Sequence, residues 1–173
     1  MEKEEDILKY LKGYLSAISA LNSFTNEHLI ADVNSFEIDP KSKLEEILIK
    51  ICRTDKYTFE VNKIGNLETE LKKILPKYTE RFIAKIAETR AYPFGDLDEE
   101  RRNEIISEVK APIDEIDFSY TICSMINKLI VEHDEIYKVK VNDSKGPFYS
   151  LQDDSFLIKG VKRAIYLKLG ITD

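Results

Sequence analysis

The spacing of apolar residues constrains the fold of this chain more than any other feature of its sequence. Five of them recur at alternating steps of four and three residues near the N-terminus, which places them on one side of a helix from about residue 3 to residue 24. They are Ile7, Leu11, Tyr14, Ile18 and Leu21. Similar spacing, together with capping residues, predicts further helices over residues 25–36, 39–51, 66–86, 96–110, 118–130 and 154–169.

The helix expected over residues 118–130 carries apolar side chains around most of its circumference. Such a helix is usually buried, so we expect Ile126 and Leu129 to belong to a central core. The last helix, over residues 154–169, would bury Val161 together with the apolar residues one turn away from it.

Alternation of apolar and polar residues, which is the period of a strand, occurs in short stretches. Residues 136–141 alternate, residues 142–147 form a turn cluster, and residues 148–151 can return as a second strand. Tyr57, Phe59 and Val61 also alternate, but no partner strand is evident near them. The expected fold class is therefore mainly α, an irregular multi-helix bundle of about six to seven helices with one small β-hairpin near residues 136–151.

Length and composition favour a single domain. The chain has 173 residues, of which 43% are hydrophobic and 34% are charged, and this composition suits one globular unit rather than a disordered or repetitive chain. We expect a single helical domain over residues 1–173. If the domain divides into two lobes, the loop from Tyr92 to Asp96 separates residues 1–92 from residues 96–173.

The net charge and the distribution of apolar residues indicate which binding partners and which cellular compartment to expect. Acidic residues number 32 and basic residues 26, so a net charge of −6 opposes non-specific attraction to nucleic acid or to an anionic membrane. No apolar run approaches the roughly 18 residues of a membrane-spanning helix, and the acidic N-terminus does not resemble a secretion signal. We therefore expect a cytoplasmic protein that does not contact a membrane.

The sequence lacks the motifs of common catalytic sites. Its six glycines are scattered, so they cannot form a phosphate-binding loop. Neither of its two histidines, His28 and His133, accompanies a recognisable serine or cysteine nucleophile motif. These observations favour a protein without a catalytic residue or a cofactor, which acts by binding another macromolecule.

The region from residue 96 to residue 117 is the most acidic part of the chain. Glu100, Glu104 and Glu108 follow one another at steps of four, so they share one side of a helix, where like charges repel. An acidic surface speeds association with a basic partner. The leading hypothesis is a non-catalytic protein that binds a basic protein, for example as an inhibitor or an immunity-type partner. The expected docking face consists of Asp96, Asp98, Glu100, Glu104 and Glu108.

An enzyme is the alternative hypothesis. Carboxylates bind Mg²⁺ or Mn²⁺. Glu132 and Glu135 form a Glu-x-x-Glu pair, which resembles the carboxylate pairs of the all-helical nucleotide pyrophosphohydrolases. His133-Asp134 resembles the central pair of the phosphohydrolases with a His…His-Asp…Asp signature, although 105 residues separate it from His28. The alternative function is a divalent-metal-dependent hydrolase of nucleotides or nucleic acids. Its metal ligands would come from Glu100, Glu104, Glu132, His133, Asp134 and Glu135.

His133 also has an interpretation that needs no metal. It follows Ile126 by seven residues and Leu129 by four, which places it on the apolar side of the expected helix. On this interpretation it is a hydrogen-bonded histidine in the core or at an interface.

Basic residues form two clusters that are candidate contacts for nucleic acid. One cluster repeats at steps of four in the middle of the chain, and the other lies near the C-terminus. Acidic and apolar residues interrupt both, so we favour ordinary solvated surfaces over a nucleic-acid site. The clusters consist of Lys77, Arg81 and Lys85, and of Lys159, Lys162 and Arg163.

Overall fold

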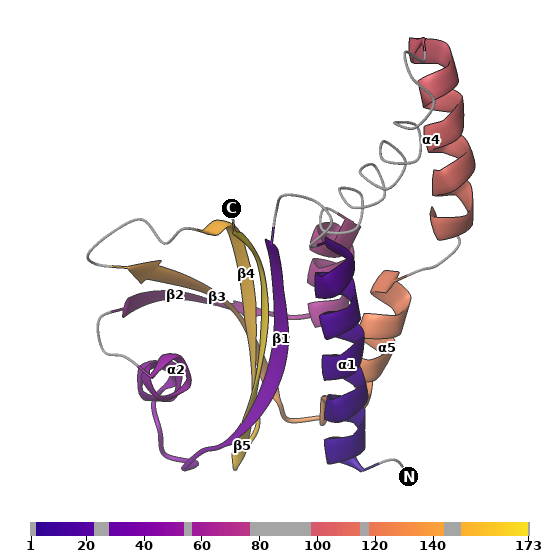
Figure 1. The fold of residues 1–173 in the computed structure, drawn as a ribbon. Coiled ribbons are helices and arrows are strands. Elements are labelled where there is room, and N and C mark those ends of the chain that lie inside the picture. Colours follow the sequence, from indigo (N-terminus) through magenta and orange to yellow (C-terminus); the bar gives the residue numbers. More distant parts are fainter. Residues whose placement is uncertain are drawn as a thin grey trace.

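The fold is known from a computed structural model, which describes residues 3–22, 28–53, 57–76, 98–114, 118–143 and 150–172 (Figure 1). The helices are α1 (Glu4–Asn22), α2 (Leu44–Cys52), α4 (Glu99–Asp114) and α5 (Phe118–Leu129), and residues 67–76 are helical as well. The strands are β1 (His28–Glu37), β2 (Tyr57–Ile64), β3 (Glu135–Asp143), β4 (Ser150–Lys159) and β5 (Arg163–Thr172).

The strands form one antiparallel sheet in the order β1-β5-β4-β3-β2. β1 pairs with the last strand of the chain along its whole length, from His28 opposite Thr172 to Glu37 opposite Arg163. At the other edge, β2 pairs with β3 from Tyr57 opposite Asp143 to Ile64 opposite Ile136. Both edge strands therefore depend on partners that lie far away in the sequence.

The expected mainly α, all-α bundle is wrong. The described residues contain a five-stranded sheet instead of one small hairpin, so the chain mixes α and β structure. The helix expected over residues 25–36 is replaced by β1, and the helix expected over residues 154–169 is replaced by β4 and β5. The strands predicted from residue 136 and from residue 57 are present as β3 and β2, and each is longer than expected.

The helical spacing near the C-terminus is misleading because β4 and β5 are covered on both faces. Strands of this kind read as continuous apolar runs rather than as alternating ones. Phe156 and Ile158 face the larger core of the protein, whereas Leu157 between them faces a smaller core on the other side. Val161, which the expected helix would bury, is 67% exposed in the turn between the two strands.

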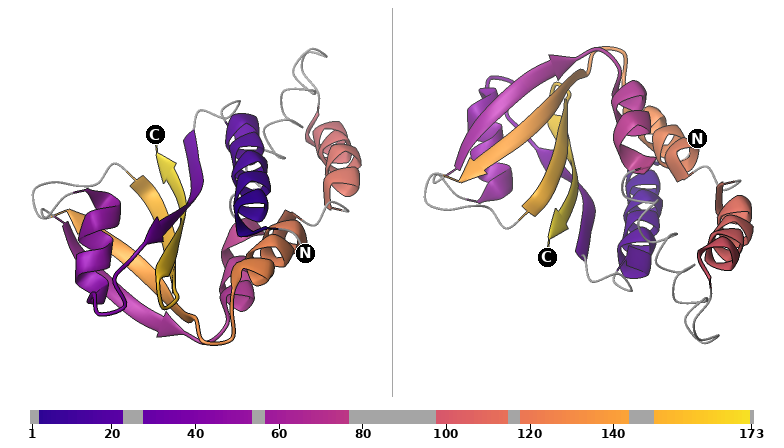
Figure 2. Two further views of the ribbon diagram at one scale, coloured as in Figure 1. Left: turned by 90° about the horizontal axis from the view of Figure 1, so that it is seen from below. Right: turned by 90° about the horizontal axis from the view of Figure 1, so that it is seen from above.

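The larger core lies between the sheet and a layer that consists of α1, α5 and the 67–76 helix (Figure 2). α1 and α5 confirm two of the expected helices, and Ile126 and Leu129 are buried as expected. α5 belongs to this outer layer rather than to the centre of a bundle, since Asn127 and Lys128 are exposed. The residues of this core that are almost fully buried include Leu11, Leu15, Leu67, Leu71, Ile122 and Phe156.

The smaller core lies on the opposite face of the sheet, which curves around α2 (Figure 2). Ile47 and Leu48 of α2 are buried there, and burying a side chain of this size contributes roughly 1.5–3 kcal/mol. α2 begins five residues later than expected, because Asp39 accepts the Lys41 N–H (2.8 Å) and the Ser42 N–H (2.9 Å) in a turn. Asp39 and Pro40 therefore mark a turn and not a helix start.

The boundary expected between the two lobes, at residues 92–96, lies outside the described residues. α4 continues four residues beyond the expected end at residue 110, and Pro112 lies inside it, two residues before its last residue. Among the described residues, no helix is both long enough and apolar enough to cross a membrane.

Candidate functional site

The acidic docking face expected from the sequence lies on α4. Asp98 precedes the helix and accepts the backbone N–H of Arg101 (2.8 Å), so this residue caps the helix as well as adding charge to its surface. Glu100, Glu104 and Glu108 are all exposed on the helix. Asp96, the remaining member of the expected face, lies outside the described residues.

The charges of this face are neutralised only in part. Glu104 pairs with Arg101 on the same helix, at 2.5 Å between Nη1 and Oε2. The hydrogen bond to Glu104, together with the charge of that carboxylate, raises the pKa of the Arg101 guanidinium. Glu100 and Glu108 form no ion pair with another described residue, so their charges face solvent.

α4 is placed so that this face is accessible. In Figures 1 and 2 the helix extends away from the sheet and from the layer that contains α1 and α5. Ile105 is half-buried and lies about 100° around the helix from the middle of the three glutamates, beside the acidic side and not opposite it, at 100° per residue. The three glutamates are themselves exposed, so a partner can reach them.

The metal ligands of the alternative hypothesis do not meet in one place. Glu100 and Glu104 lie on α4, which precedes α5, whereas residues 132–135 follow α5. α5, whose 12 residues span about 18 Å, lies between the two groups along the chain. Within the described part of the chain, no three histidine, cysteine, aspartate or glutamate side chains are arranged to hold a metal ion.

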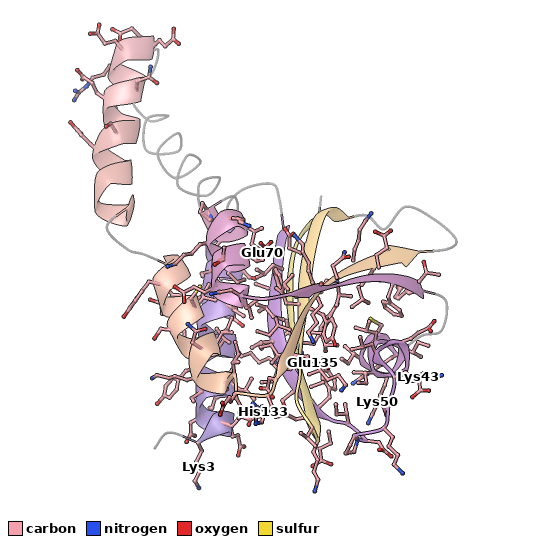
Figure 3. The ribbon with its side chains drawn as sticks, turned by 180° about the vertical axis from the view of Figure 1, so that it is seen from behind. Lys3, Lys43, Lys50, Glu70, His133 and Glu135 are labelled. Carbon is pink, nitrogen blue, oxygen red and sulfur yellow. The ribbon has the colours of Figure 1, made fainter. Side chains whose placement is uncertain are left out.

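Residues 132–134 lie in the connection between α5 and β3, and Glu135 is the first residue of β3. Glu132 and His133 are exposed, so His133 does not lie in the core, because α5 ends at Leu129 before it reaches His133. Its expected place at an interface stays a prediction. Asp134 accepts the Val131 N–H (2.9 Å) and a hydrogen bond from Arg163 Nη2 (3.1 Å). Figure 3 shows His133 in the turn near the N-terminal end of α1.

Glu135 is held by lysines on the neighbouring strands. Its Oε1 lies 2.6 Å from Lys63 Nζ, and its Oε2 lies 3.9 Å from Lys159 Nζ. The hydrogen bond from Lys63, followed by one from Tyr137, lowers the pKa of the Glu135 carboxyl. This carboxylate therefore joins β2, β3 and β4 by ion pairs and is not presented to a ligand.

The basic clusters do not form a shared surface among the described residues. Lys159 approaches Glu135, and Arg163 pairs with Glu4 and Asp134, which leaves Lys162 as the exposed lysine of this cluster, in the turn between β4 and β5. The other cluster, Lys77, Arg81 and Lys85, lies outside the described residues.

A cleft that the sequence analysis missed lies beside α2, on the inner face of the curved sheet. Its volume is about 340 Å³. The strands that line it are β1, β2, β3 and β5, and the last turn of α2 closes one side. The lining residues are Asp32, Asn34, Phe36, Ile51, Cys52, Tyr57, Val141, Tyr166 and Lys168.

The alternation of residues along β1 could have indicated part of this cleft from the sequence. Ala31 and Val33 face the larger core, whereas Asp32 and Asn34 face the cleft, and this alternation is the period of a strand. The interpretation of residues 25–36 as a helix concealed it. The pairing of β1 with β5, which brings Asp32 opposite Lys168, depends on long-range contacts that no local pattern contains.

Comparisons with known proteins identify no family. No family model matches the sequence, and a search of the curated proteins finds no match. Two solved structures of MAF1 from citrus, in different crystal forms, are similar in outline. One has a TM-score of 0.48 at 8% identity, the other 0.38 at 10%, and each comparison covers 92% of this chain and 98% of the other. Likenesses at this level carry no argument about function.

Proposed function

We propose that this protein is non-catalytic and binds a basic protein through the acidic side of α4. The observation that carries the proposal is the exposure of Glu100, Glu104 and Glu108 on a helix that extends away from the rest of the molecule. Three like charges on one side of a helix repel one another, so their arrangement does not stabilise α4 by itself. A basic partner would relieve this repulsion and would be attracted over several ångströms.

Three acidic side chains elsewhere in the protein differ from the glutamates of α4, because they pair with other elements of the fold. Asp134, Asp154 and Glu135 each pair with a cation from a different strand, so they hold the fold together. Glu104 pairs only with Arg101 of its own helix, whose charge also acts on Glu108, and Glu100 forms no ion pair with a described residue. The acids of α4 therefore differ from those three in having no partner on another element.

The test reverses the charges of the face and leaves the apolar side of α4 intact. A variant with Glu100→Lys, Glu104→Lys and Glu108→Lys is compared with a control that carries Glu5→Lys, Glu45→Lys and Glu132→Lys. All three control positions are exposed, and they are scattered over α1, α2 and the turn after α5. Both variants change the net charge equally, so any difference between them reports the location of the charge.

The readout is the set of proteins that immobilised wild type and variants retain from a lysate of the source cells. We expect a basic protein that wild type and the scattered control retain at low salt and release at high salt. The α4 variant should bind this protein about tenfold or more weakly, because the attraction is inverted. Identical retention by all three proteins, or no retained protein, would contradict the proposal.

A further inference from the structure

β1 is an edge strand of the described sheet, so no strand of that sheet pairs with one side of its backbone (Figure 1). Just after β1, the Ile38 N–H donates to the Lys162 carbonyl (3.0 Å), in the same register that pairs β1 with β5. Backbone groups of successive residues in an antiparallel strand point alternately to its two sides. The even-numbered residues of β1 therefore bond to β5, and Ala31, Val33 and Ser35 point their N–H and C=O groups to the free edge.

Side chains of the same chain occupy two of the groups on this edge. The Val33 N–H donates to Asp32 Oδ1 (2.9 Å), and the Glu37 carbonyl accepts a hydrogen bond from Lys50 Nζ of α2 (3.0 Å). The outward N–H groups of Ala31 and Ser35 have no hydrogen-bond partner among the described residues. The free edge is thus interrupted at its middle and at its end.

Asp32 is held at the edge by Lys12 and Asn34. Asp32 Oδ1 lies 3.3 Å from Lys12 Nζ, and Asp32 Oδ2 accepts a hydrogen bond from Asn34 Nδ2 (2.6 Å). Asn34 Oδ1 in turn accepts a hydrogen bond from Lys12 Nζ (3.1 Å), so the three side chains form a closed ring. α1 packs against the larger core, whereas Asp32 and Asn34 face the cleft on the other side of the sheet. Lys12 therefore reaches across the edge of β1.

This ring of three side chains covers the edge without adding much stability. The side chains of Lys12 and Asp32 are 53% and 42% exposed, and an ion pair as exposed as this contributes little to folding. β1, however, is ten residues long and contains neither proline nor lysine. A long edge strand of this kind is a template for pairing with another chain unless something blocks it.

We propose that Lys12, Asp32 and Asn34 prevent β1 from pairing with β1 of a second copy of this chain. Two identical edge strands can pair antiparallel about a twofold axis. With the axis at Val33, this residue lies opposite Val33 of the second copy, and Ala31 lies opposite Ser35. The two Val33 residues would then exchange N–H···O=C hydrogen bonds, and Asp32 occupies the N–H that this exchange requires. The proposal concerns β1 and is independent of α4.

Substitutions in the full chain separate the hydrogen bond of Asp32 from its charge. Asp32→Ala frees the Val33 N–H, whereas Asp32→Asn removes the charge and keeps a carbonyl oxygen that can accept this N–H. Glu37→Ala is the matched control, because it removes one carboxylate from an exposed position of the same strand. Lys12→Met removes the exposed lysine that holds Asp32 and is the second test, since it leaves β1 itself unchanged. Far-UV circular dichroism establishes that each variant is folded.

Sedimentation equilibrium over a range of protein concentrations measures self-association. Asp32→Ala should form a dimer at least about tenfold more tightly than wild type, because each copy gains a backbone N–H that can donate to the other. Lys12→Met should show the same effect more weakly, and Asp32→Asn and Glu37→Ala should behave like wild type. In the Asp32→Ala dimer, hydrogen exchange at the Ala31 and Ser35 amides should be slower than in wild type.

Four results would overturn the proposal. Asp32→Ala and Lys12→Met could both self-associate no more than wild type, or the Asp32→Ala dimer could leave exchange at Ala31 and Ser35 unchanged. Asp32→Asn could associate as tightly as Asp32→Ala, which would exclude the hydrogen bond to Val33 as the cause. Glu37→Ala could do the same, which would assign the effect to net charge. The variant with three lysines on α4 should self-associate like wild type, so a failure here leaves the α4 proposal intact.

Discussion

Gly160 occupies a position where the turn between β4 and β5 meets the connection between α5 and β3. A Cβ atom at this residue would lie 2.8 Å from Asp134 Oδ1, which is closer than atoms of this kind approach. Asp134 cannot move away freely, because it accepts hydrogen bonds from the Val131 N–H and from Arg163. The absence of a side chain at residue 160 is therefore part of how these segments fit together.

The substitution Gly160→Ala should destabilise the protein by roughly 1–3 kcal/mol, through overpacking and the loss of hydrogen bonds at Asp134. Urea unfolding followed by far-UV circular dichroism measures the change. Gly65→Ala is the matched control, since a Cβ atom there meets nothing within 4 Å, and it should change the free energy of unfolding little. Equal effects of the two substitutions would show that the contact with Asp134 is unimportant.

Arg163 extends the same group of contacts to the helical layer. Its guanidinium donates to the Leu129 carbonyl at the end of α5 and to Asp134, and it pairs with Glu4 at the start of α1. Burial opposes the charge of the guanidinium, but Glu4 and Asp134 outweigh it, so the pKa of Arg163 is raised. Arg163, for which the sequence favoured an ordinary solvated surface over a nucleic-acid contact, therefore joins three elements of the fold.

At the scale of elements, predictability depends on how many faces of an element are covered. α1 and α5 each pack one side against the sheet and expose the other, so their apolar residues recur at the helical period and both helices could be predicted. β2 is an edge strand in which residues 57–61 alternate between half-buried and exposed, and its period of two was also visible. β4 and β5 carry apolar residues on both faces, so their period of two was hidden and a misleading helical spacing appeared instead.

α5 provides a quantitative test at this scale. Leu129 is 2% exposed in the larger core, next to the end of the helix. Leu129→Ala should reduce the free energy of unfolding by about 2–5 kcal/mol, because burial is lost and a cavity remains. Lys128→Ala, one residue away on the exposed side, should change it by less than about 0.5 kcal/mol. A loss at Leu129 within experimental error would contradict the packing of α5.

At the scale of the whole molecule, the order of the strands decides which residues become neighbours. β1 follows the first helix and β5 ends the chain, yet they pair along ten residues and bring Asp32 and Lys168 together. The placement of Glu100, Glu104 and Glu108 on one exposed helix could be predicted, because the three residues follow one another at steps of four in a single element. The residues of the cleft come from β1, β2, β3, β5 and α2, so their assembly depends on the topology and could not be read from local patterns.

The same topology separates the carboxylates of the metal hypothesis, and this leads to a prediction for the whole molecule. An ion that binds only the folded state must stabilise it, so its binding would raise the melting temperature. Because no three ligating side chains of the described residues are arranged to hold a metal ion, we expect millimolar Mg²⁺ or Mn²⁺ to leave the melting temperature of the EDTA-treated protein nearly unchanged. Differential scanning calorimetry with and without each ion measures this. An upward shift that Glu104→Gln or Glu132→Gln abolished would instead favour a metal-dependent hydrolase, since a shared ion would then have to bring these two glutamates together.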